Sequence, residues 1–438
     1  MGKKIKIAVV GLWHQGVVAS ACLTKIGHDV TGLDAQDDKI QSLNLGQSPI
    51  YEPRLNYLLK KGLKSKHLKF STDYSVTRDA DLIILSHDTP VNEKDESDLS
   101  IIYQDLKKII PYIKSQIIHI TAQVPAGTSN KLVKLIQKRV KNFNNLAYTP
   151  ENLRLGSAIE RYMNPPLPVI GVSNEKVFKQ LKLIYKSLSN NWQKTDLLSS
   201  EMVKHGLNTF LATSLSLANE LGNISDSLGA NGQEVGRLLK LEPRIGKYAL
   251  MRPGLGFAGG TLARDVKTLN TISHSYQLKT PLLNSILRTN DVQNNLPIDI
   301  ISKIFRSKLK NKKITVLGLT YKANTSTLRR SYSLEIIRKL QRMGANVSCY
   351  DPKADRNEVK RKKYLNFYES LDEACSKSDL LLVATPWKEF HKINFKNILK
   401  LVNNKHFFDL TGMFCSDLIN KIGFKYIAIG DGSLHKVL

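Results

Sequence analysis

The feature that most constrains the fold is a local pattern that occurs twice, once near each end of the chain. In each copy an apolar run ends at a glycine, a helical pattern stops at a second glycine, and another apolar run ends at an aspartate. The copies comprise 4–10, Gly11, 17–26, Gly27, 28–33 and Asp34, and then 312–317, Gly318, 333–343, Gly344, 345–350 and Asp351. Two apolar runs joined through one helix predict a βαβ unit with parallel strands. We therefore expect two α/β domains with Rossmann-like, doubly wound parallel sheets.

Further apolar runs extend both predicted sheets. Strands are expected at 81–86, 116–124, 379–385 and 406–412. The stretch 197–231, rich in Ala, Leu and Ser, predicts a long helix that can link the domains and offer a dimer surface. The expected division is a dinucleotide-binding domain at 1–196, a central helical domain at 197–296 and a C-terminal Rossmann-like domain at 297–438.

The composition argues against several kinds of protein. No run of about 18 apolar residues occurs, so no membrane-spanning helix is expected. The first apolar run leads straight into the Gly11 turn, which predicts a strand and not a signal peptide. The cysteines are scattered without metal-ligand spacing, which favours a reducing cytoplasm and predicts no metal site. They are Cys22, Cys349, Cys375 and Cys415.

The formal net charge is +27. Such a charge is compatible with a polyanion, an acidic membrane surface or anionic small molecules as partners. The lysines are spread over the whole chain, with no arginine-rich tail and no interleaving of aromatic and basic residues. Binding of nucleic acid is therefore disfavoured.

The first glycine turn reads Gly11-Leu12-Trp13-His14-Gln15-Gly16. Dinucleotide-binding turns follow the pattern G-x-G-x-x-G, in which the middle glycine lets the backbone approach the pyrophosphate. Trp13 stands at that middle position, so the turn alone is a weak signal, and an empty, degenerate site is the alternative. Asp34 ends the second strand, where a carboxylate can accept both ribose hydroxyls and repel the 2′-phosphate of NADP. The pattern therefore favours NAD as cofactor.

The order of further short motifs resembles the UDP-glucose/GDP-mannose dehydrogenase family over nearly the whole chain. In the N-terminal part the matching residues are Lys39, Asn44-Leu45-Gly46, Pro49-Ile50-Tyr51-Glu52-Pro53, Leu55, Asp88-Thr89-Pro90, Val124-Pro125-Ala126-Gly127-Thr128 and Pro150-Glu151-Asn152-Leu153. Beyond it they are Glu201, Lys204, Asn208-Thr209-Phe210, Arg244-Ile245-Gly246, Gly254, Gly256-Phe257-Ala258-Gly259, Asp265-Val266, Gly318-Leu319, Lys322, Asn324, Arg329, Ser331 and Tyr350-Asp351-Pro352.

The resemblance implies an NAD-dependent oxidation of a UDP- or GDP-hexose at its C6 alcohol, for polysaccharide biosynthesis. It implies cofactor contacts from Gly11, Leu12, Trp13, Gly16, Asp34, Lys39, Thr89 and Gln123. It implies substrate contacts from Glu151, Asn152, Leu153, Lys204, Asn208, Arg244, Phe257, Gly259 and Lys322. It also implies that the C-terminal domain binds the nucleotide of the substrate, and that a homodimer forms through the central helices, with Arg244 reaching the partner's substrate.

The catalytic chemistry can be argued from a few side chains. Lys204 and Asn208 are four residues apart, so on a helix they share one face, where an amine and an amide can stabilise an alkoxide at the sugar carbon. Lys204 can also accept a proton if burial lowers its pKa. Asp265 is expected to orient a water molecule or Lys204. Glu151 follows a proline on a loop and is expected to reach into a cleft, with helix capping as the alternative.

One departure from the family pattern affects the chemistry. Members of the family use a cysteine that captures the intermediate aldehyde as a thioester, and Thr261 stands at that position here. A threonine hydroxyl is a poor nucleophile without a strong adjacent base. Leu155, Gln123 and Thr327 replace a glutamate, a threonine and an aspartate of the family pattern.

Three interpretations follow from these changes. In the first, the protein oxidises the hydrated aldehyde without covalent capture. In the second, it performs a single two-electron oxidation, or the reverse reduction, of a nucleotide sugar. In the third, it binds NAD and a nucleotide sugar without turnover. Because Asp34, Lys204, Asn208, Asp265 and Lys322 are retained, catalysis is favoured over binding alone.

Overall fold

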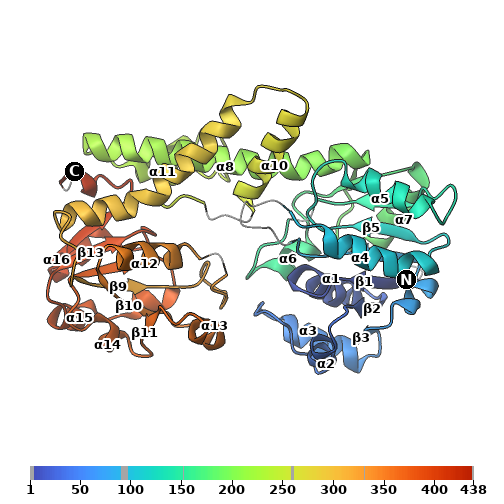
Figure 1. Cartoon of the computed structure of the whole chain (residues 1–438), viewed down its shortest axis with the longest axis horizontal. Helices are drawn as coiled ribbons and strands as arrows, with labels where there is room; N and C mark the ends of the chain where they lie inside the picture. Colours follow the sequence, from blue (N-terminus) through green and yellow to red (C-terminus); the bar gives the residue numbers. More distant parts are fainter. Residues whose placement is uncertain (1–3, 90–96, 151, 258–260, 330, 437–438) are drawn as a thin grey trace. The chain divides into compact units, whose positions relative to one another are not determined.

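The structure is a computed structural model that describes residues 4–89, 97–150, 152–257, 261–329 and 331–436. The chain forms two compact units, Met1–Leu207 and Asn208–Leu438 (Figure 1). The division falls within one long helix, α8 (Leu197–Leu228). Each unit is described by itself below.

The first unit contains an eight-stranded sheet with the order β3-β2-β1-β4-β5-β6-β7-β8. Adjacent strands are parallel except β6 and β7, which pair antiparallel. The strands are β1 (Lys6–Val10), β2 (Asp29–Leu33), β3 (Leu68–Ser71), β4 (Leu82–Leu85), β5 (Ile117–Ile120), β6 (Leu146–Tyr148), β7 (Val169–Val172) and β8 (Gln193–Thr195). The connecting helices are α1 (His14–Lys25), α2 (Asp37–Asn44), α3 (Leu55–Lys64), η1 (Tyr74–Asp79), α4 (Ser100–Ile109), η2 (Ile110–Tyr112), α5 (Thr128–Gln137), α6 (Ala158–Met163) and α7 (Glu175–Ile184).

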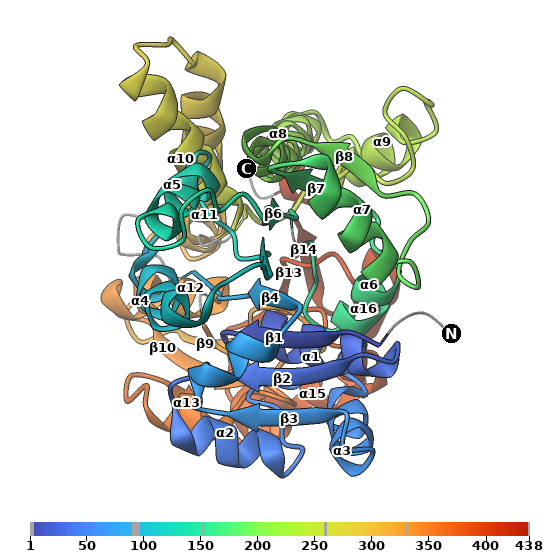
Figure 2. The same cartoon turned by 90° about the vertical axis from the view of Figure 1, so that its right-hand side faces the viewer.

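Both faces of this sheet are buried, which explains its continuous apolar strands. In β1, Ile7 and Val9 join the core beneath α1, α3, α6 and α7. Ala8 and Val10 point the other way, into the core beneath α4 and α5. Figure 2 shows α1, α6 and α7 on one side of the sheet and α4 and α5 on the other. The carboxyl ends of the strands are left for ligands, as in other open parallel sheets.

The second unit begins with helices and ends with a six-stranded, all-parallel sheet of order β11-β10-β9-β12-β13-β14. Its helices are α9 (Gly232–Leu239), α10 (Leu262–Ser275), α11 (Pro281–Ile304), α12 (Tyr332–Arg342), α13 (Arg356–Lys360), α14 (Leu371–Cys375), η3 (Lys388–Lys392), α15 (Phe395–Leu401), α16 (Ser416–Ile422) and η4 (Ser433–Lys436). Its strands are β9 (Lys313–Leu317), β10 (Asn346–Tyr350), β11 (Asn366–Phe367), β12 (Leu380–Val383), β13 (His406–Asp409) and β14 (Lys425–Ala428).

The first six strands of unit one and the six strands of unit two follow the same spatial order. The predicted fold class, two Rossmann-like parallel sheets with helices between them, is therefore confirmed. Four predicted strands are shorter than expected: 81–86, 116–124, 379–385 and 406–412 are reduced to β4, β5, β12 and β13. Helix α1 starts at His14 and not at residue 17, because the first turn of the helix lies inside the glycine loop. Helix α11 continues through the expected boundary at 296/297.

Among the described residues, no helix is both long enough and apolar enough to cross a membrane.

Candidate functional site

The glycine loop after β1 requires glycine at its first and third positions. Gly11 has a φ of 93°, and a Cβ there would lie 2.5 Å from the ring of His87. A Cβ on Gly16 would lie 1.9 Å from the carbonyl oxygen of Gly11, far inside any van der Waals contact. The backbone therefore turns as tightly as a dinucleotide-binding loop does.

The middle position of the loop tolerates Trp13. Its φ is −105°, which any residue can adopt, and 37% of the residue is exposed. Trp13 is the N-cap of α1, no side chain caps that end of the helix, and the first turn carries no acidic residue. The N–H groups at the start of α1, with the positive end of the helix dipole, thus suit an anionic pyrophosphate.

Asp34 joins this loop to the end of β2. Its Oδ2 accepts hydrogen bonds from Leu12 N at 3.0 Å and from Lys39 Nζ at 2.7 Å, and its Oδ1 accepts one from Gln36 N at 3.2 Å. The carboxylate is largely buried but reaches the surface. Lys39, matched only by resemblance in the sequence, therefore pairs with the acid expected to bind the ribose.

Two other expected cofactor contacts lie on adjacent loops. Thr89 follows β4, Gln123 follows β5, and both are buried. The Thr89 hydroxyl donates to the carbonyl oxygen of Gln123 at 2.7 Å. This bond ties together the two loops at the carboxyl ends of the central strands.

The segment after β6 holds three of the expected substrate contacts. Glu151 lies outside the described residues. The carbonyl oxygen of Asn152 accepts a hydrogen bond from Arg161 Nε at 2.9 Å, and Leu153 packs against the core beneath α1. Thr149, just before the segment, donates its backbone N–H to Ile120 O at 3.0 Å. Its hydroxyl lies 2.8 Å from Nε2 of His119.

A cavity of about 80 Å³ lies under this segment in the first unit. Its polar wall includes Gln15 and three residues that follow strands β4, β5 and β6, namely Ser86, Thr121 and Thr149. Its apolar wall includes Leu153, Pro166 and Trp192. Ligands of open α/β sheets bind at this edge, so the cavity lies where the reacting end of a dinucleotide is expected.

His119 forms part of the cavity wall and is neutral. Burial lowers the pKa of its ring from 6.5 to about 3. Both ring nitrogens have partners, since Nδ1 lies 2.7 Å from the Tyr185 hydroxyl and Nε2 lies near Thr149. The imidazole is therefore a fixed structural link and not an acid or base at neutral pH.

This shift predicts a particular acid sensitivity. The pKa of His119 is lower in the folded than in the unfolded protein. Protonation of His119 therefore leaves the free energy of unfolding unchanged above pH 6.5 and lowers it as the pH falls toward 3. In that window His119 lowers the free energy of unfolding by up to about 1.4 kcal/mol per pH unit. Urea unfolding of wild type and H119Q between pH 6.5 and 4.5 is expected to show a flatter dependence for the variant. Equal slopes would refute the assignment.

The start of α8 is anchored by a buried acid. Glu201 accepts hydrogen bonds from the backbone N–H and the hydroxyl of Ser129, both at 2.7 Å, and from Gly127 N. Burial raises the pKa of Glu201. These bonds attach α8 to the turn before α5. One turn further along α8 lies Lys204, which is 5% exposed.

In the second unit, Asn208 donates a hydrogen bond from Nδ2 to the Asp265 carboxylate, and both residues are buried. The Asp265 backbone N–H donates to the carbonyl oxygen of Thr261 at 3.2 Å. Asp265 thus orients the Asn208 amide, which the sequence did not predict. Lys204 and Asn208 lie one turn apart on α8, as predicted.

Thr261 is exposed and is the N-cap of α10, although its hydroxyl makes no capping bond. None of the four cysteines lies in the sequence between Gly254 and Asp265. Burial raises the thiol pKa of Cys22, Cys349 and Cys375 to about 12, and Cys415 is the exposed N-cap of α16. Among the described residues, no group of three or more His, Cys, Asp or Glu side chains could hold a metal ion.

The other expected substrate contacts are in the second unit. Asn290 of α11 holds the Phe257 backbone with both amide atoms, at 2.7 Å to N and 3.1 Å to O. Gly259 lies outside the described residues. The Arg244 side chain is 88% exposed, with Nε bound to Glu242. Lys322 follows β9 at the carboxyl edge of the second sheet.

Asp351 differs from Asp34 despite the equivalent place in its βαβ unit. It is fully buried, and its carboxylate accepts bonds from the backbone N–H groups of Leu319, Thr320, Lys353 and Ala354 and from Trp387 Nε1. The oxygens of the Asp351 carboxylate are already used as acceptors by the surrounding loops, so this carboxylate is not available to accept hydrogen bonds from a ribose. Only the first βαβ unit therefore has the acid of an NAD site.

Sequence reasoning missed several of these residues. Asn290 and His119 give no local signal, because their partners are far away in the chain. Glu52 was part of a matched motif, but its contacts were not predicted.

Comparison with known proteins gives three matches to sequence profiles of one family. The NAD binding domain of the UDP-glucose/GDP-mannose dehydrogenase family matches residues 5–189, its central domain matches 198–292, and its UDP binding domain matches 315–416. A UDP-glucose 6-dehydrogenase of Rickettsia typhi is 34% identical over 97% of this chain and 99% of its own.

Solved structures agree with the sequence matches. A UDP-glucose dehydrogenase from Pyrobaculum islandicum superposes with a TM-score of 0.86 at 26% identity, over 93% of this chain and 94% of that one. The UDP-N-acetyl-mannosamine dehydrogenase of Staphylococcus aureus gives 0.80 at 25% identity, over 97% and 98%.

Proposed function

Since this chain belongs to the UDP-glucose/GDP-mannose dehydrogenase family and is an NAD-dependent nucleotide-sugar dehydrogenase, we propose that it oxidises the C6 alcohol of a UDP-hexose once and releases the aldehyde. The balanced step is R–CH2OH + NAD⁺ → R–CHO + NADH + H⁺. The bound nicotinamide supplies the hydride acceptor. The product would feed polysaccharide biosynthesis.

The cysteine inventory carries this proposal. A second oxidation through a thioester needs a thiolate that attacks the aldehyde. Three of the four thiols are buried with raised pKa, and the fourth is beside α16. Thr261 stands exposed at the position of the nucleophile, and an unactivated hydroxyl does not form such an adduct.

The side chains that the first oxidation needs are present in this chain. The neutral amine of Lys204 can take the proton of the C6 hydroxyl, and the resulting ammonium, together with the Asn208 amide, can stabilise the negative charge that develops on the C6 oxygen. Asp265 fixes the direction of the Asn208 amide through its hydrogen bond. Lys204, nearly buried on the same helix, is the group that we assign to hold or accept that proton.

UDP is favoured over GDP as the nucleotide of the substrate. The profile of a UDP binding domain matches 315–416, and the relatives above are named as dehydrogenases of UDP-glucose or UDP-N-acetyl-mannosamine. We assign Lys322 to the nucleotide, and Asn152, Leu153 and Phe257 to the neighbourhood of the sugar.

A substrate panel tests this function. The purified protein would be mixed with NAD and UDP-glucose, UDP-N-acetylglucosamine, UDP-N-acetylmannosamine or GDP-mannose, and absorbance at about 340 nm would be followed. NADH formation with a UDP-sugar is expected. Tight binding of NAD and a UDP-sugar without NADH would instead support a non-catalytic role.

We propose a homodimer through α8. Six large apolar side chains of this helix are exposed, and four of them recur at intervals of seven, seven and four residues, which places these four on one face. They are Phe210, Leu217, Ile224 and Leu228. An apolar stripe of this length is rarely left in water. The exposed Arg244 would then serve the partner's substrate, as in the family resemblance.

Charging this stripe is expected to give monomers. The double variant L217E/I224E places carboxylates in the proposed interface, where burial of a charge without a partner costs several kcal/mol. Sedimentation equilibrium should give twice the chain mass for wild type and the single mass for the variant. The control L183E changes a more exposed leucine on α7 and should stay dimeric. A monomeric wild type would contradict the proposal.

A further inference from the structure

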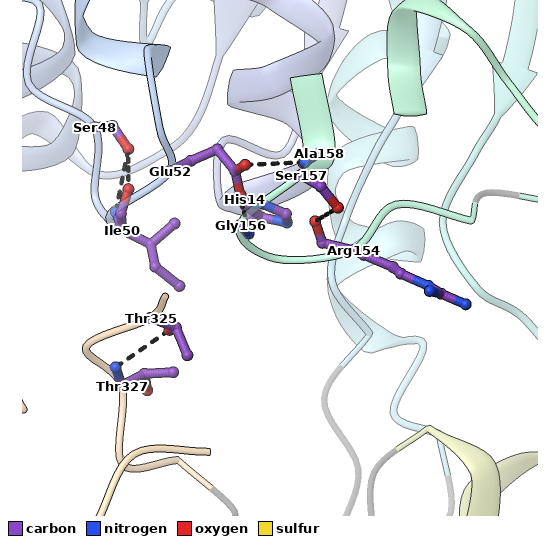
Figure 3. A network of polar contacts seen from close by, with 10 residues as sticks. All are labelled: His14, Ser48, Ile50, Glu52, Arg154, Gly156, Ser157, Ala158, Thr325 and Thr327. Atoms are coloured by element: carbon purple, nitrogen blue, oxygen red, sulfur yellow. Dashed lines mark hydrogen bonds and ion pairs between the residues drawn. The ribbon is translucent and has the colours of Figure 1, made fainter. Parts of the chain in front are cut away.

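A buried carboxylate links two loops of the first unit that the proposed reaction must align. Glu52 is 4% exposed and lies between the glycine loop and the turn before α6 (Figure 3). Its Oε2 accepts hydrogen bonds from Nε2 of His14 at 3.0 Å and from Gly156 N at 2.8 Å. Its Oε1 accepts one from Ala158 N at 2.9 Å.

The partners of Glu52 belong to the two binding segments. His14 is the first residue of α1, at the end assigned to the pyrophosphate. Gly156 and Ala158 follow the segment with Asn152 and Leu153, and Ala158 begins α6. The N-cap of α6, Ser157, makes no side-chain capping bond, so Glu52 satisfies that helix end from another part of the chain.

The charge of Glu52 makes the link stiff. Burial alone would raise the pKa of this carboxyl, but the hydrogen bond from His14 and those from Gly156 and Ala158 outweigh it, and the net shift is downward. An ionised carboxylate that accepts three hydrogen bonds while shielded from water holds its donors more strongly than a neutral acceptor does. Replacement of any one donor leaves the other two in place.

We propose that Glu52 is a positioning residue that, through His14, transmits occupancy of the cofactor loop to the 152–158 segment. This inference rests on the proposed function, because hydride transfer requires the nicotinamide and the sugar carbon to be correctly aligned. A displacement of about 1 Å between reacting groups can lower the rate about 100-fold. Contacts of the pyrophosphate with the start of α1 would immobilise His14, then Glu52, and then the amides of Gly156 and Ala158.

Hydrogen–deuterium exchange tests the link without catalysis. In wild type, saturation with NAD is expected to slow exchange in peptides covering 152–160 at least threefold. H14L breaks the link on the cofactor side only, so its exchange without NAD should match wild type and the NAD effect should disappear. H14Q keeps a donor near the position of Nε2 and should restore the NAD effect.

Turnover gives a second measure. With a substrate that wild type oxidises, H14L is expected to lower kcat at least tenfold with less than a threefold change in the Kd for NAD, and H14Q should recover most of the loss. A merely structural contact would change stability but not the NAD dependence of exchange.

The outcomes separate this inference from the proposed function. An NAD effect that survives in H14L, or is absent in a wild type that binds NAD by calorimetry, would overturn the role of Glu52. Absence of NADH with every sugar, while the exchange results hold, would overturn the proposed function and leave the link standing.

Discussion

Replacement of Lys204 by methionine is expected to lower kcat about 1000-fold, since removal of one preorganised group that stabilises an oxyanion costs 10²- to 10³-fold and the proton acceptor is lost as well. Lys204 is nearly buried on α8, one turn before Asn208, whose amide is oriented by Asp265. Methionine keeps the length of the side chain without its charge. The Kd for NAD, measured by calorimetry, should change less than threefold.

The matched control for this variant is K194M. Lys194 is half-exposed on β8 and forms an ion pair with Glu175. We assign it no part in stabilising the alkoxide. Its replacement should leave kcat within twofold of wild type. Full turnover by K204M would remove Lys204 from the mechanism.

Replacement of Gly16 by alanine is expected to weaken NAD binding more than 100-fold. The added Cβ would lie 1.9 Å from the backbone carbonyl oxygen of Gly11. Because the backbone fixes the position of a Cβ, no side-chain rotation can relieve this clash. The loop must open, which moves the start of α1 away from the pyrophosphate that it is expected to bind. Calorimetric titration with NAD measures the loss.

The control for the added methyl group is G206A. Gly206 lies in α8, and a Cβ there would have no heavy atom within 4 Å, so alanine should if anything stabilise the helix. Its affinity for NAD should equal that of wild type. Unchanged NAD binding by G16A would mean that the glycine loop is not the cofactor site.

Much of the fold follows from the sequence because glycine and aspartate mark the ends of the strands. Gly11 and Gly318 both have positive φ with a neighbouring side chain where a Cβ would be, so the turns after β1 and β9 can be recognised locally. The strands missed in the sequence are short, and several of them, such as β8 (Gln193–Thr195), lie at the edge of a sheet. Their pairing depends on neighbours that no local pattern encodes.

Many residues of the candidate site could be predicted from the sequence, but their hydrogen-bond partners could not. Asp34 and Asp351 occupy equivalent places in the sequence pattern, yet one pairs with Lys39 near the surface and the other is saturated by buried donors. The roles of Glu52 and Asn290 depend on partners about 100 and 33 residues away, respectively. Trp13, which weakens the fingerprint as a pattern, fits because the backbone at that position has a negative φ.

The resemblance places Thr261 where family members carry the nucleophilic cysteine, and our proposal of a single oxidation depends on that placement. We propose that the retained side chains serve the alcohol-to-aldehyde step and that the thioester step lacks its nucleophile. Thr261 stands at the position of the family cysteine, three cysteines are buried, and the exposed Cys415 lies at the N-cap of α16. The alternative is oxidation of the hydrated aldehyde, which needs no covalent intermediate and would yield an acid.

Counting NADH per sugar consumed distinguishes these reactions most directly. A limiting amount of the UDP-sugar that the protein oxidises would be taken to completion with excess NAD, hydroxylamine would be added as an aldehyde trap only after NADH formation has stopped, and the product would be identified by mass. We predict one NADH per sugar and a trapped aldehyde. Two NADH per sugar with a carboxylate product would contradict the account.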